Sequence, residues 1–490
     1  MTSQWLVALT FVAYLVFILA IGLYAYLRTR NASDYFLGGR SLPPAVAALS
    51  AGASDMSGWL LMGLPGAAYI SGLSSGWMAI GLFAGIVLSW TTMARRLRIY
   101  TYGLEDALTV PAYLHRRFNL KHPYLRSVCA LFILLFFLFY VASGLKAGGI
   151  LFEAVFEWNY RWAVVIGAAA VISYTLFGGF LAVSWTDVFQ GLLMSLALVA
   201  VPLVVINSEG GFTASWDRLH EKVPELMHWM SDNTGQALGI VAVLSSLAWG
   251  LGYFGQPHIV ARFMAVRRPE DVPTAAGVAA VWSLFGFIGA LSVGLFGHLE
   301  IQPVLSDKES EQVFMALVEA LFHPVVAGIL LAAILSAIMS TADSQLLVSS
   351  AALSEDIYHV WFGRETSPEA MVKVGRWAVV GLSLIAVAVA MDPESKVLEV
   401  VAYAWAGLGA AFGPATLISV YWSRMTGAGA IAGVVVGGLT VVIWKQLSGG
   451  IFELYELLPG FVLSAAAIVI VSAVTKCPAA VVERHRKLVG

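Results

Sequence analysis

Long apolar runs alternate with short polar segments along the whole chain. Each run is long enough to cross a bilayer as a helix, which needs about 20 apolar residues. Thirteen such runs lie near residues 5–27, 43–70, 75–94, 127–149, 162–182, 187–206, 235–256, 274–297, 322–346, 375–391, 397–421, 427–446 and 456–475. The first ends at Arg28 and Arg30 without a small-residue cleavage site, so we expect it to remain as a membrane helix.

Composition agrees with this pattern. Of the 490 residues 59% are hydrophobic and 12% are charged, about half the charged fraction of a soluble protein, and the mean hydropathy is +0.82. We therefore expect an all-α polytopic membrane protein with about 13 transmembrane helices, forming a single transmembrane domain over 1–490. Nothing in the composition indicates a nucleic-acid partner or an obligate protein partner.

Several function classes lack the residues they need. Cys129 and Cys477 have no partner at a metal-ligand spacing, and the nine histidines form no His-x-x-x-His or His-Glu-x-x-His pattern. No Gly-x-x-x-x-Gly-Lys-Ser/Thr run is present, so no ATP site is expected. The chain is therefore expected to be neither a membrane enzyme nor an ATP-driven pump, and to need no cofactor.

Basic residues are distributed unequally between alternate loops. One set of loops and the C-terminal tail hold most of the arginines and lysines, including the segment 95–126, whereas the other set holds six. The positive-inside rule then places the N-terminus outside and the C-terminus in the cytoplasm. Two outer loops, 207–233 and 298–320, are expected to carry short surface helices.

Asp55 is the residue that points most directly to function. It is the only charged residue between Arg40 and Arg95 and lies in the apolar run 43–70. A carboxylate at membrane depth costs roughly 2.5–3.5 kcal/mol on insertion scales. Gly52 and Gly58 flank it, which favours an interrupted helix that binds a cation or a proton; a locally paired structural acid is the alternative.

The seventh run contains a second candidate break, in Ala-Trp-Gly-Leu-Gly-Tyr-Phe-Gly-Gln-Pro at 248–257. Glycines alone can indicate close helix packing, but three glycines with a proline favour an unwound turn. The two breaks lie in spans two and seven, so each would begin a repeat of five helices (2–6, then 7–11). A repeat with an odd number of helices crosses the membrane in the opposite direction in its second copy. Broken helices at matching positions of inverted halves indicate a transporter's central site.

The ninth run adds oxygen ligands. Ala337, Ser340, Thr341 and Ser344 share one helical face and could offer oxygens to a hard cation, although membrane serines often only bond the i−4 carbonyl. Asp187, at the start of the sixth run, either caps that helix or lies on an ion pathway. For His258 and Arg262, at the inner end of the seventh run, orientation and gating are equally open.

At these motifs the chain resembles the solute:sodium symporter family, over nearly its whole length. The matching segments are Ser-Ala-Gly-Ala-Ser-Asp-Met-Ser-Gly-Trp-Leu-Leu-Met-Gly-Leu-Pro-Gly (50–66), Phe-Gly-Gly-Phe-Leu-Ala-Val-Ser-Trp-Thr-Asp (177–187), Trp-Gly-Leu-Gly-Tyr-Phe-Gly-Gln-Pro-His-Ile (249–259) and Tyr-Ala-Trp-Ala-Gly-Leu-Gly-Ala-Ala-Phe-Gly-Pro (403–414). The resemblance is fairly specific for the branch that carries proline, although Ala-Asp-Ser at 342–344 departs from that branch.

The resemblance implies a LeuT-like five-plus-five inverted repeat with broken helices 2 and 7. Its parts would be an extra N-terminal helix and inner loop (1–40), repeats over 41–206 and 235–421, and C-terminal helices with a cytoplasmic tail over 427–490. The implied activity is sodium-coupled uptake of L-proline by alternating access, across the cytoplasmic (inner) membrane of a bacterium. Another small solute, such as pantothenate, a monocarboxylate or another amino acid, is the alternative.

The resemblance also implies the site residues. Sodium would be bound by Ala53, Met56, Ala337, Ser340 and Thr341, with Asp55 supporting it electrostatically. Proline would be bound by Ser57, Gly58, Tyr140, Trp249, Tyr253 and Pro257. Asp187, Arg40 and Ser344 are candidates for the ion pathway or for gating.

Overall fold

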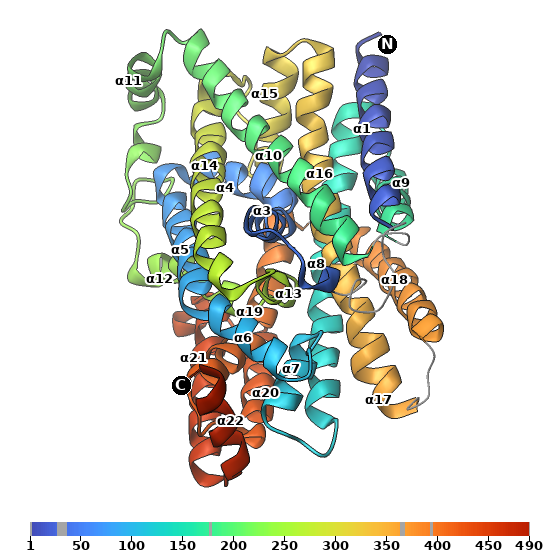
Figure 1. The fold of residues 1–490 in the computed structure, drawn as a ribbon. Helices are drawn as coiled ribbons and strands as arrows, with labels where there is room; N and C mark the ends of the chain where they lie inside the picture. Colours follow the sequence, from blue (N-terminus) through green and yellow to red (C-terminus); the bar gives the residue numbers. More distant parts are fainter. Residues whose placement is uncertain (1, 27–36, 176–178, 363–367, 393–394, 490) are drawn as a thin grey trace.

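Helices make up almost all of the regular structure in the computed structural model of the chain (Figure 1). The structure describes residues 2–26, 37–175, 179–362, 368–392 and 395–489. Within these ranges there are isolated β-bridges but no β-strand. The expected all-α architecture is therefore confirmed. Most of the inner loop expected within 1–40, residues 27–36, lies outside the described ranges.

Ten helices or continuous helical runs in the described ranges are long and apolar enough to cross a membrane. They are contained in α1 (Thr2–Tyr26), the run Trp59–Gly103, α8 (Tyr124–Phe156), α10 (Phe180–Ser208), the run Pro269–Glu300 with α14 (Val272–Glu300), the run Pro324–Phe362 with α16 (Pro324–Ala351), α18 (Pro368–Ala390), α19 (Val397–Tyr421), α20 (Gly427–Trp444) and α21 (Leu457–Val474). Two further apolar helical segments, Tyr160–Val171 in α9 (Tyr160–Thr175) and Ile240–Phe254, are shorter.

Two of the thirteen expected spans are these shorter segments, and a third is missing from the number because spans two and three are continuous. The run expected over 43–70 is interrupted, so that its first half, α3 (Pro44–Asp55), has only 12 residues. Its second half continues through the π-helix η2 (Trp59–Gly63) into α4 (Leu64–Ser71) and then, across a turn, into α5 (Gly76–Leu88). Spans two and three thus join into one helical run.

The expected break in the second span lies directly after Asp55. Met56 has a non-helical backbone (φ −81°, ψ 71°), and a new helical segment begins after Gly58. The amide of Met56 still donates to the carbonyl of Gly52. The α-helix is therefore interrupted over the three residues 56–58, at the end of α3, which lies at mid-height of the molecule (Figure 1).

The seventh span is also broken, as expected from its glycines. α12 (Ile240–Ala248) tightens into the 3-10 helix η6 (Trp249–Phe254), and α13 (Pro257–Ala265) begins after an extended Gln256. A Cβ on Gly250 would lie 2.0 Å from the carbonyl oxygen of Gly81 in α5. A Cβ on Gly252 would lie 2.0 Å from the indole nitrogen of Trp405 in α19. The glycines therefore allow both an unwound turn and close packing, because the unwound segment packs directly against α5 and α19.

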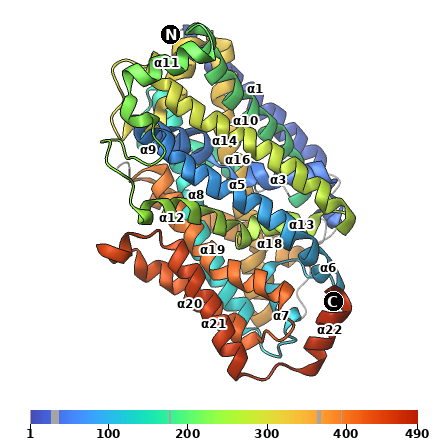
Figure 2. The same cartoon turned by 90° about the vertical axis from the view of Figure 1, so that its left-hand side faces the viewer.

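The two broken elements occupy the centre of the bundle. α3 packs against α10, α13, α14 and α16, while η6 lies between α5 and α19. α1 covers α10 and α16 on one side, and α20 and α21 pack on α19 on the other (Figures 1 and 2).

Short helices cover the two ends of the molecule. Both loops expected to carry surface helices contain a helix, α11 (Phe212–Lys222) in one and α15 (Val313–Leu321) in the other. α11 is mostly exposed or half-buried, whereas α15 buries most of its residues, so the expectation of a surface helix is wrong for α15. The remaining short helices are η1 (Gly38–Arg40), η3 (Gly72–Ser75), the π-helix η4 (Ser89–Ala94), α6 (Arg95–Gly103), α7 (Val110–Arg117), η5 (Pro224–Met227), η7 (Pro269–Asp271), η8 (Glu309–Gln312), the π-helix η9 (Ala352–Tyr358), α17 (His359–Phe362), η10 (Gly450–Glu453) and α22 (Ala479–Val489). α7, α17 and α22 lie at the end opposite α11 (Figure 1).

α22 is held against α6 and α7 through a histidine. The ring of His485 hydrogen-bonds Tyr100 in α6, and its Nδ1 lies 3.0 Å from a guanidinium nitrogen of Arg117. Burial, together with the positive charges of Arg117 and Arg96, lowers the pKa of His485 to about 4. The docked helix therefore holds a neutral histidine.

We expect acidification to loosen this contact. A histidine whose pKa is lower when docked than when free binds more protons in the free state, so docking weakens as the pH falls from about 6.5 towards 4. A spin label at Leu488→Cys, with Cys129 and Cys477 replaced, should become more mobile over that range. In His485→Asn, which has no titrating group, the mobility should not change with pH; an identical pH response would contradict this account.

Candidate functional site

Asp55 lies at the end of α3 and is 1% exposed. Its Oδ2 accepts a hydrogen bond from the hydroxyl of Tyr253 in η6 at 2.5 Å. Its backbone carbonyl accepts from Tyr140 in α8 at 3.2 Å and from the indole of Trp59 at 3.1 Å. Oδ1 has no hydrogen-bond partner among the described residues, so this carboxylate retains an acceptor for a ligand.

The last turn of α3 meets α16 through oxygen atoms. The hydroxyl of Ser340 donates to the carbonyl of Ala53 at 2.8 Å and to that of Ala337 at 3.1 Å. The hydroxyl of Thr341 lies 3.5 Å from the same Ala53 carbonyl. Met56, at the α3 C-cap, adds a carbonyl outside regular helix. Together the set expected for sodium is one of neutral oxygens beside a carboxylate, the ligand type that hard cations prefer.

Four of the six residues expected to bind the substrate lie around Asp55. Ser57 and Gly58 form the break itself and are buried. A Cβ on Gly58 would lie 2.8 Å from the Cβ of Ala147 in α8, so the break packs closely on that helix. Tyr140 and Tyr253 reach Asp55 from two other elements.

The other two, Trp249 and Pro257, occupy the two ends of the second break. The ring of Trp249 stacks on Tyr455 at a centroid distance of 5.1 Å, and its carbonyl accepts from the Trp405 indole at 2.8 Å. Pro257 is the first residue of α13. The structure places both on the broken helix, at its two ends.

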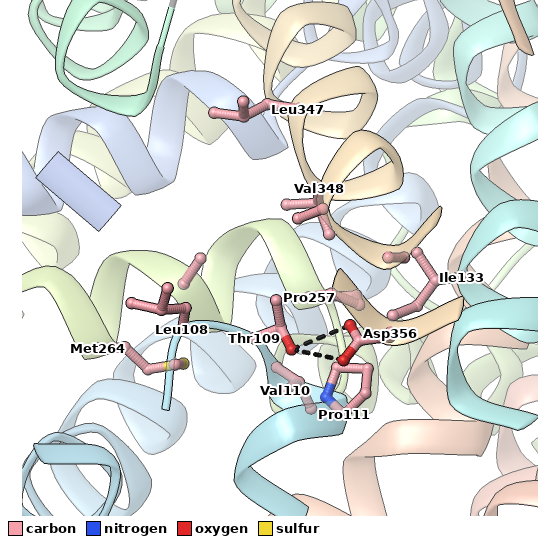
Figure 3. A pocket seen from close by; sticks show the side chains of 13 residues that line it. Leu108, Thr109, Val110, Pro111, Ile133, Pro257, Met264, Leu347, Val348 and Asp356 are labelled. Atoms are coloured by element: carbon pink, nitrogen blue, oxygen red, sulfur yellow. Dashed lines mark hydrogen bonds between the residues drawn. The ribbon is translucent and has the colours of Figure 1, made fainter. Parts of the chain in front are cut away.

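Pro257 lines a pocket that lies between α7, α13 and the C-terminal end of α16 (Figure 3). Most of the lining is apolar. Its polar members are Thr109, the N-cap of α7, and Asp356 in η9, whose two carboxylate oxygens accept from the Thr109 hydroxyl at 3.2 and 3.0 Å. Arg126 pairs with Asp356 at 2.7 Å. A polar cluster thus forms the part of the lining next to α7.

A buried ion pair lies behind the Ala53 junction. Asp187 in α10 and Arg262 in α13 are both 0% exposed, with Oδ2 and Nη2 3.1 Å apart. Hydroxyl groups complete the network: Ser50 and Ser54 donate to Asp187, and Arg262 donates to Ser50 and to Ser344. The network joins α3, α10, α13 and α16.

The capping interpretation of Asp187 is wrong. α10 begins after Gly179, which makes no side-chain cap, and Asp187 lies two turns inside the helix. The run predicted to start at residue 187 begins earlier, so the carboxylate needs a positive partner instead of a helix end.

Arg40 lies away from Asp55, near the end of the molecule that holds α7 and α22. It pairs with Asp106 at 2.5 Å and donates to Thr101 and to the carbonyls of Ala107 and Met264. Because Met264 belongs to α13, Arg40 is connected to the broken seventh span but not to the oxygen set at Ala53.

Sequence reasoning missed several residues that the site uses. Ser50 and Ser54 stand in the motif around Asp55, one helical turn apart, and that spacing was a usable signal. Trp405 belongs to a matched motif at 403–414, yet no local pattern indicates that its indole reaches the carbonyl of Trp249. That contact depends on tertiary packing.

A scan against protein-family models matches the sodium:solute symporter family over residues 35–437. The chain belongs to this family. The chain is 48% identical over 481 residues to the sodium/proline symporter of Escherichia coli (strain K12), covering 97% of this chain and 94% of that protein. It is 45% identical over 461 residues to the high-affinity proline transporter PutP of Bacillus subtilis (strain 168), covering 94% and 96%.

Among solved structures, this symporter-family chain is similar to a Na+-coupled sialic acid symporter in a substrate-bound outward-open state. The TM-score is 0.78 at 20% identity, covering 96% of this chain and 98% of that one. At this identity the likeness concerns the fold, which is that of LeuT-like sodium symporters. With ten apolar helical spans in the described part of the chain, the symporter is a multi-pass protein of the bacterial inner membrane.

Removing one partner of the Asp187–Arg262 pair should destabilise the symporter more than removing both. A single change leaves a buried charge unpaired, which costs roughly 3–5 kcal/mol. Asp187→Asn and Arg262→Gln should each lower the unfolding temperature in detergent, and the double variant should recover part of the loss. Additive losses in the double variant would show that the two side chains do not interact energetically.

Proposed function

We propose that this chain is a sodium/proline symporter, which takes up L-proline across the inner membrane by coupling it to sodium entry. The observation that carries the proposal is the junction of Ala53 with Ser340 and Thr341, where a broken helix presents carbonyls to hydroxyls of α16 beside Asp55. Support for proline comes from relatives at 48% and 45% identity that are named proline transporters.

Sodium would bind at this junction. The carbonyls of Ala53, Met56 and Ala337 and the hydroxyls of Ser340 and Thr341 supply the oxygens, and the free Oδ1 of Asp55 supplies nearby negative charge. A monovalent ion suits a set with a single carboxylate beside it. Binding would fix the end of α3, and with it the adjacent Ser57 and Gly58.

Proline would bind next to the sodium, against Ser57 and Gly58. Gly58 precedes η2, and the proline carboxylate would approach the backbone there, because Gly58 has no side chain to block it. The neighbouring amides of Ser57, Trp59 and Leu60 already donate within the break. Tyr140, Tyr253 and residues of the second break, from Trp249 to Pro257, would enclose the apolar ring. A zwitterion with a small ring needs few charged side chains, and no Arg or Lys occurs in η6 or at the first break.

Thirteen membrane helices in a five-plus-five inverted repeat are part of the same proposal, with the N-terminus outside and the C-terminus in the cytoplasm. The separation of the start of α1 from α22 in Figure 1 is consistent with this orientation. α6, α7 and α22, which carry many of the basic residues, lie at the end assigned to the cytoplasm.

The proposed cycle is alternating access. Sodium binds from outside and orders the first break, proline binds beside it, the outer side closes, and both leave towards the cytoplasm. The pocket lined by Pro257 is the proposed exit, with Thr109 and Asp356 in its wall. One sodium ion crossing about 100 mV releases roughly 2.3 kcal/mol, and a tenfold gradient adds about 1.4 kcal/mol. Together these support several-hundredfold accumulation of proline at one-to-one coupling.

Uptake into proteoliposomes tests the function directly. Labelled L-proline should accumulate with an inward sodium gradient and not with a matched potassium gradient. Excess unlabelled proline should block uptake, and pantothenate or acetate should not. Absence of accumulation by intact protein would refute proline transport, whereas block by another solute would identify that solute as the substrate.

Asp55→Asn keeps the shape of the side chain and should raise the sodium requirement.

The hydroxyls of α16 should determine sodium affinity. Ser340→Ala and Thr341→Val should each raise the sodium concentration for half-maximal proline uptake about tenfold, equivalent to about 1.4 kcal/mol for one lost ligand. Ser349→Ala is the matched control, because its hydroxyl donates to the carbonyl of Gln345 within α16. Unchanged sodium dependence in both test variants would exclude α16 from the ion site.

A further inference from the structure

Gln256 occupies an unusual position in the second break. It is 0% exposed, has an extended backbone (φ −76°, ψ 110°) and directly precedes Pro257, the first residue of α13. It therefore lies in the unwound segment between η6 and α13. A buried amide side chain at such a place has one donor group and one acceptor group to satisfy.

The donor group of Gln256 is satisfied, and this determines how the amide is oriented. Nε2 donates to the backbone carbonyl of Trp405 in α19 at 3.0 Å. Oε1 then points away from that carbonyl, and it has no hydrogen-bond partner among the described residues. A buried carbonyl oxygen held in this way is ready to accept a hydrogen bond from a ligand.

Aromatic rings surround the residue that anchors Gln256. The Trp405 ring meets Tyr253 at a centroid distance of 5.0 Å and an interplanar angle of 78°. It meets Tyr140 at 6.5 Å and 76°. Both tyrosines also hydrogen-bond Asp55, so the aromatic cluster connects Gln256 to the candidate substrate site. Aromatic faces attract ammonium groups through their positive charge, and this attraction does not require N–H bonds.

We propose that Oε1 of Gln256 accepts an N–H bond from the substrate's ring ammonium, and that Gln256 thereby selects for amines that carry N–H bonds. The inference rests on the proposed proline transport and assigns one recognition contact within it. The aromatic cluster supplies attraction for the positive charge, and Gln256 supplies the dependence on N–H bonds. A substrate whose nitrogen is fully methylated would leave the oxygen without a partner.

The experiment compares ligands that differ only at the ring nitrogen. Sodium-dependent binding of L-proline to the purified protein is displaced by N-methyl-L-proline, which has one N–H bond, and by N,N-dimethylproline, which has none. The wild type should bind proline about ten- to hundredfold more tightly than the dimethyl compound, the range expected for one hydrogen bond to a charged group. Gln256→Met, of similar volume, should weaken proline binding by that factor and leave the dimethyl compound nearly unchanged.

Gln190→Met is the matched control. Gln190 is likewise 0% exposed, its Nε2 donates to Tyr14 at 3.2 Å, and its Oε1 has no partner among the described residues. It lies between α10 and α1, away from the aromatic cluster, so its replacement should leave the proline preference intact. If Gln256→Met keeps that preference, or weakens both ligands equally, the assignment is wrong. If the wild type binds no proline at all, the proposed function fails instead.

Discussion

The site depends on backbone carbonyls that no helix satisfies. α3 ends at Asp55 in the middle of the bundle, where no bulk water is available to hydrogen-bond the freed groups. The structure provides partners from elsewhere: Ser340 for Ala53, Tyr140 and Trp59 for Asp55, and Trp405 for Trp249 in the second break. Each partner comes from another element or from beyond the break. The breaks therefore determine how α8, α16 and α19 must be arranged.

The buried charges follow the same logic. Asp187 and Arg262 neutralise one another deep in the protein; Oδ2 of Asp187 also accepts from Ser50 and Ser54, whereas its Oδ1 has no hydrogen-bond partner among the described residues. Asp55 likewise has one oxygen without such a partner, but its other oxygen accepts from a tyrosine hydroxyl and is not paired with a cation. Of these two buried carboxylates, the one without a fixed cation lies beside the oxygen set of α16, where a mobile cation is expected.

Much of this arrangement could be predicted from the sequence. An isolated aspartate in a glycine-rich apolar run predicted an interrupted helix around Asp55, and the structure has the break at Met56–Gly58. The glycines with Pro257 predicted the second break. Hydroxyls at helical spacing predicted the α16 face that meets Ala53. The wrong interpretation of Asp187 as a helix cap has a simple cause. Asp187 was placed at a helix end because hydropathy located the start of α10 too late, and a window average cannot locate helix ends to within two turns.

What remained hidden was pairing between distant segments. The contact of Gln256 with Trp405 spans 149 residues, and the Asp187–Arg262 pair spans 75. Each residue has an unremarkable local context, and only the packed bundle brings them together. Family resemblance named most of the residues around Asp55, and it also named Trp249 and Pro257, which lie at the start of η6 and at the start of α13.

The seam between α5 and η6 has a mechanical consequence. Gly81 and Gly250 meet backbone to backbone, without intervening side chains that could change rotamer and absorb a displacement. Such a contact cannot yield gradually: the two segments either move together as one rigid piece or separate completely. Any added methyl group there would act purely by steric exclusion, within the same short helix whose Tyr253 hydrogen-bonds Asp55.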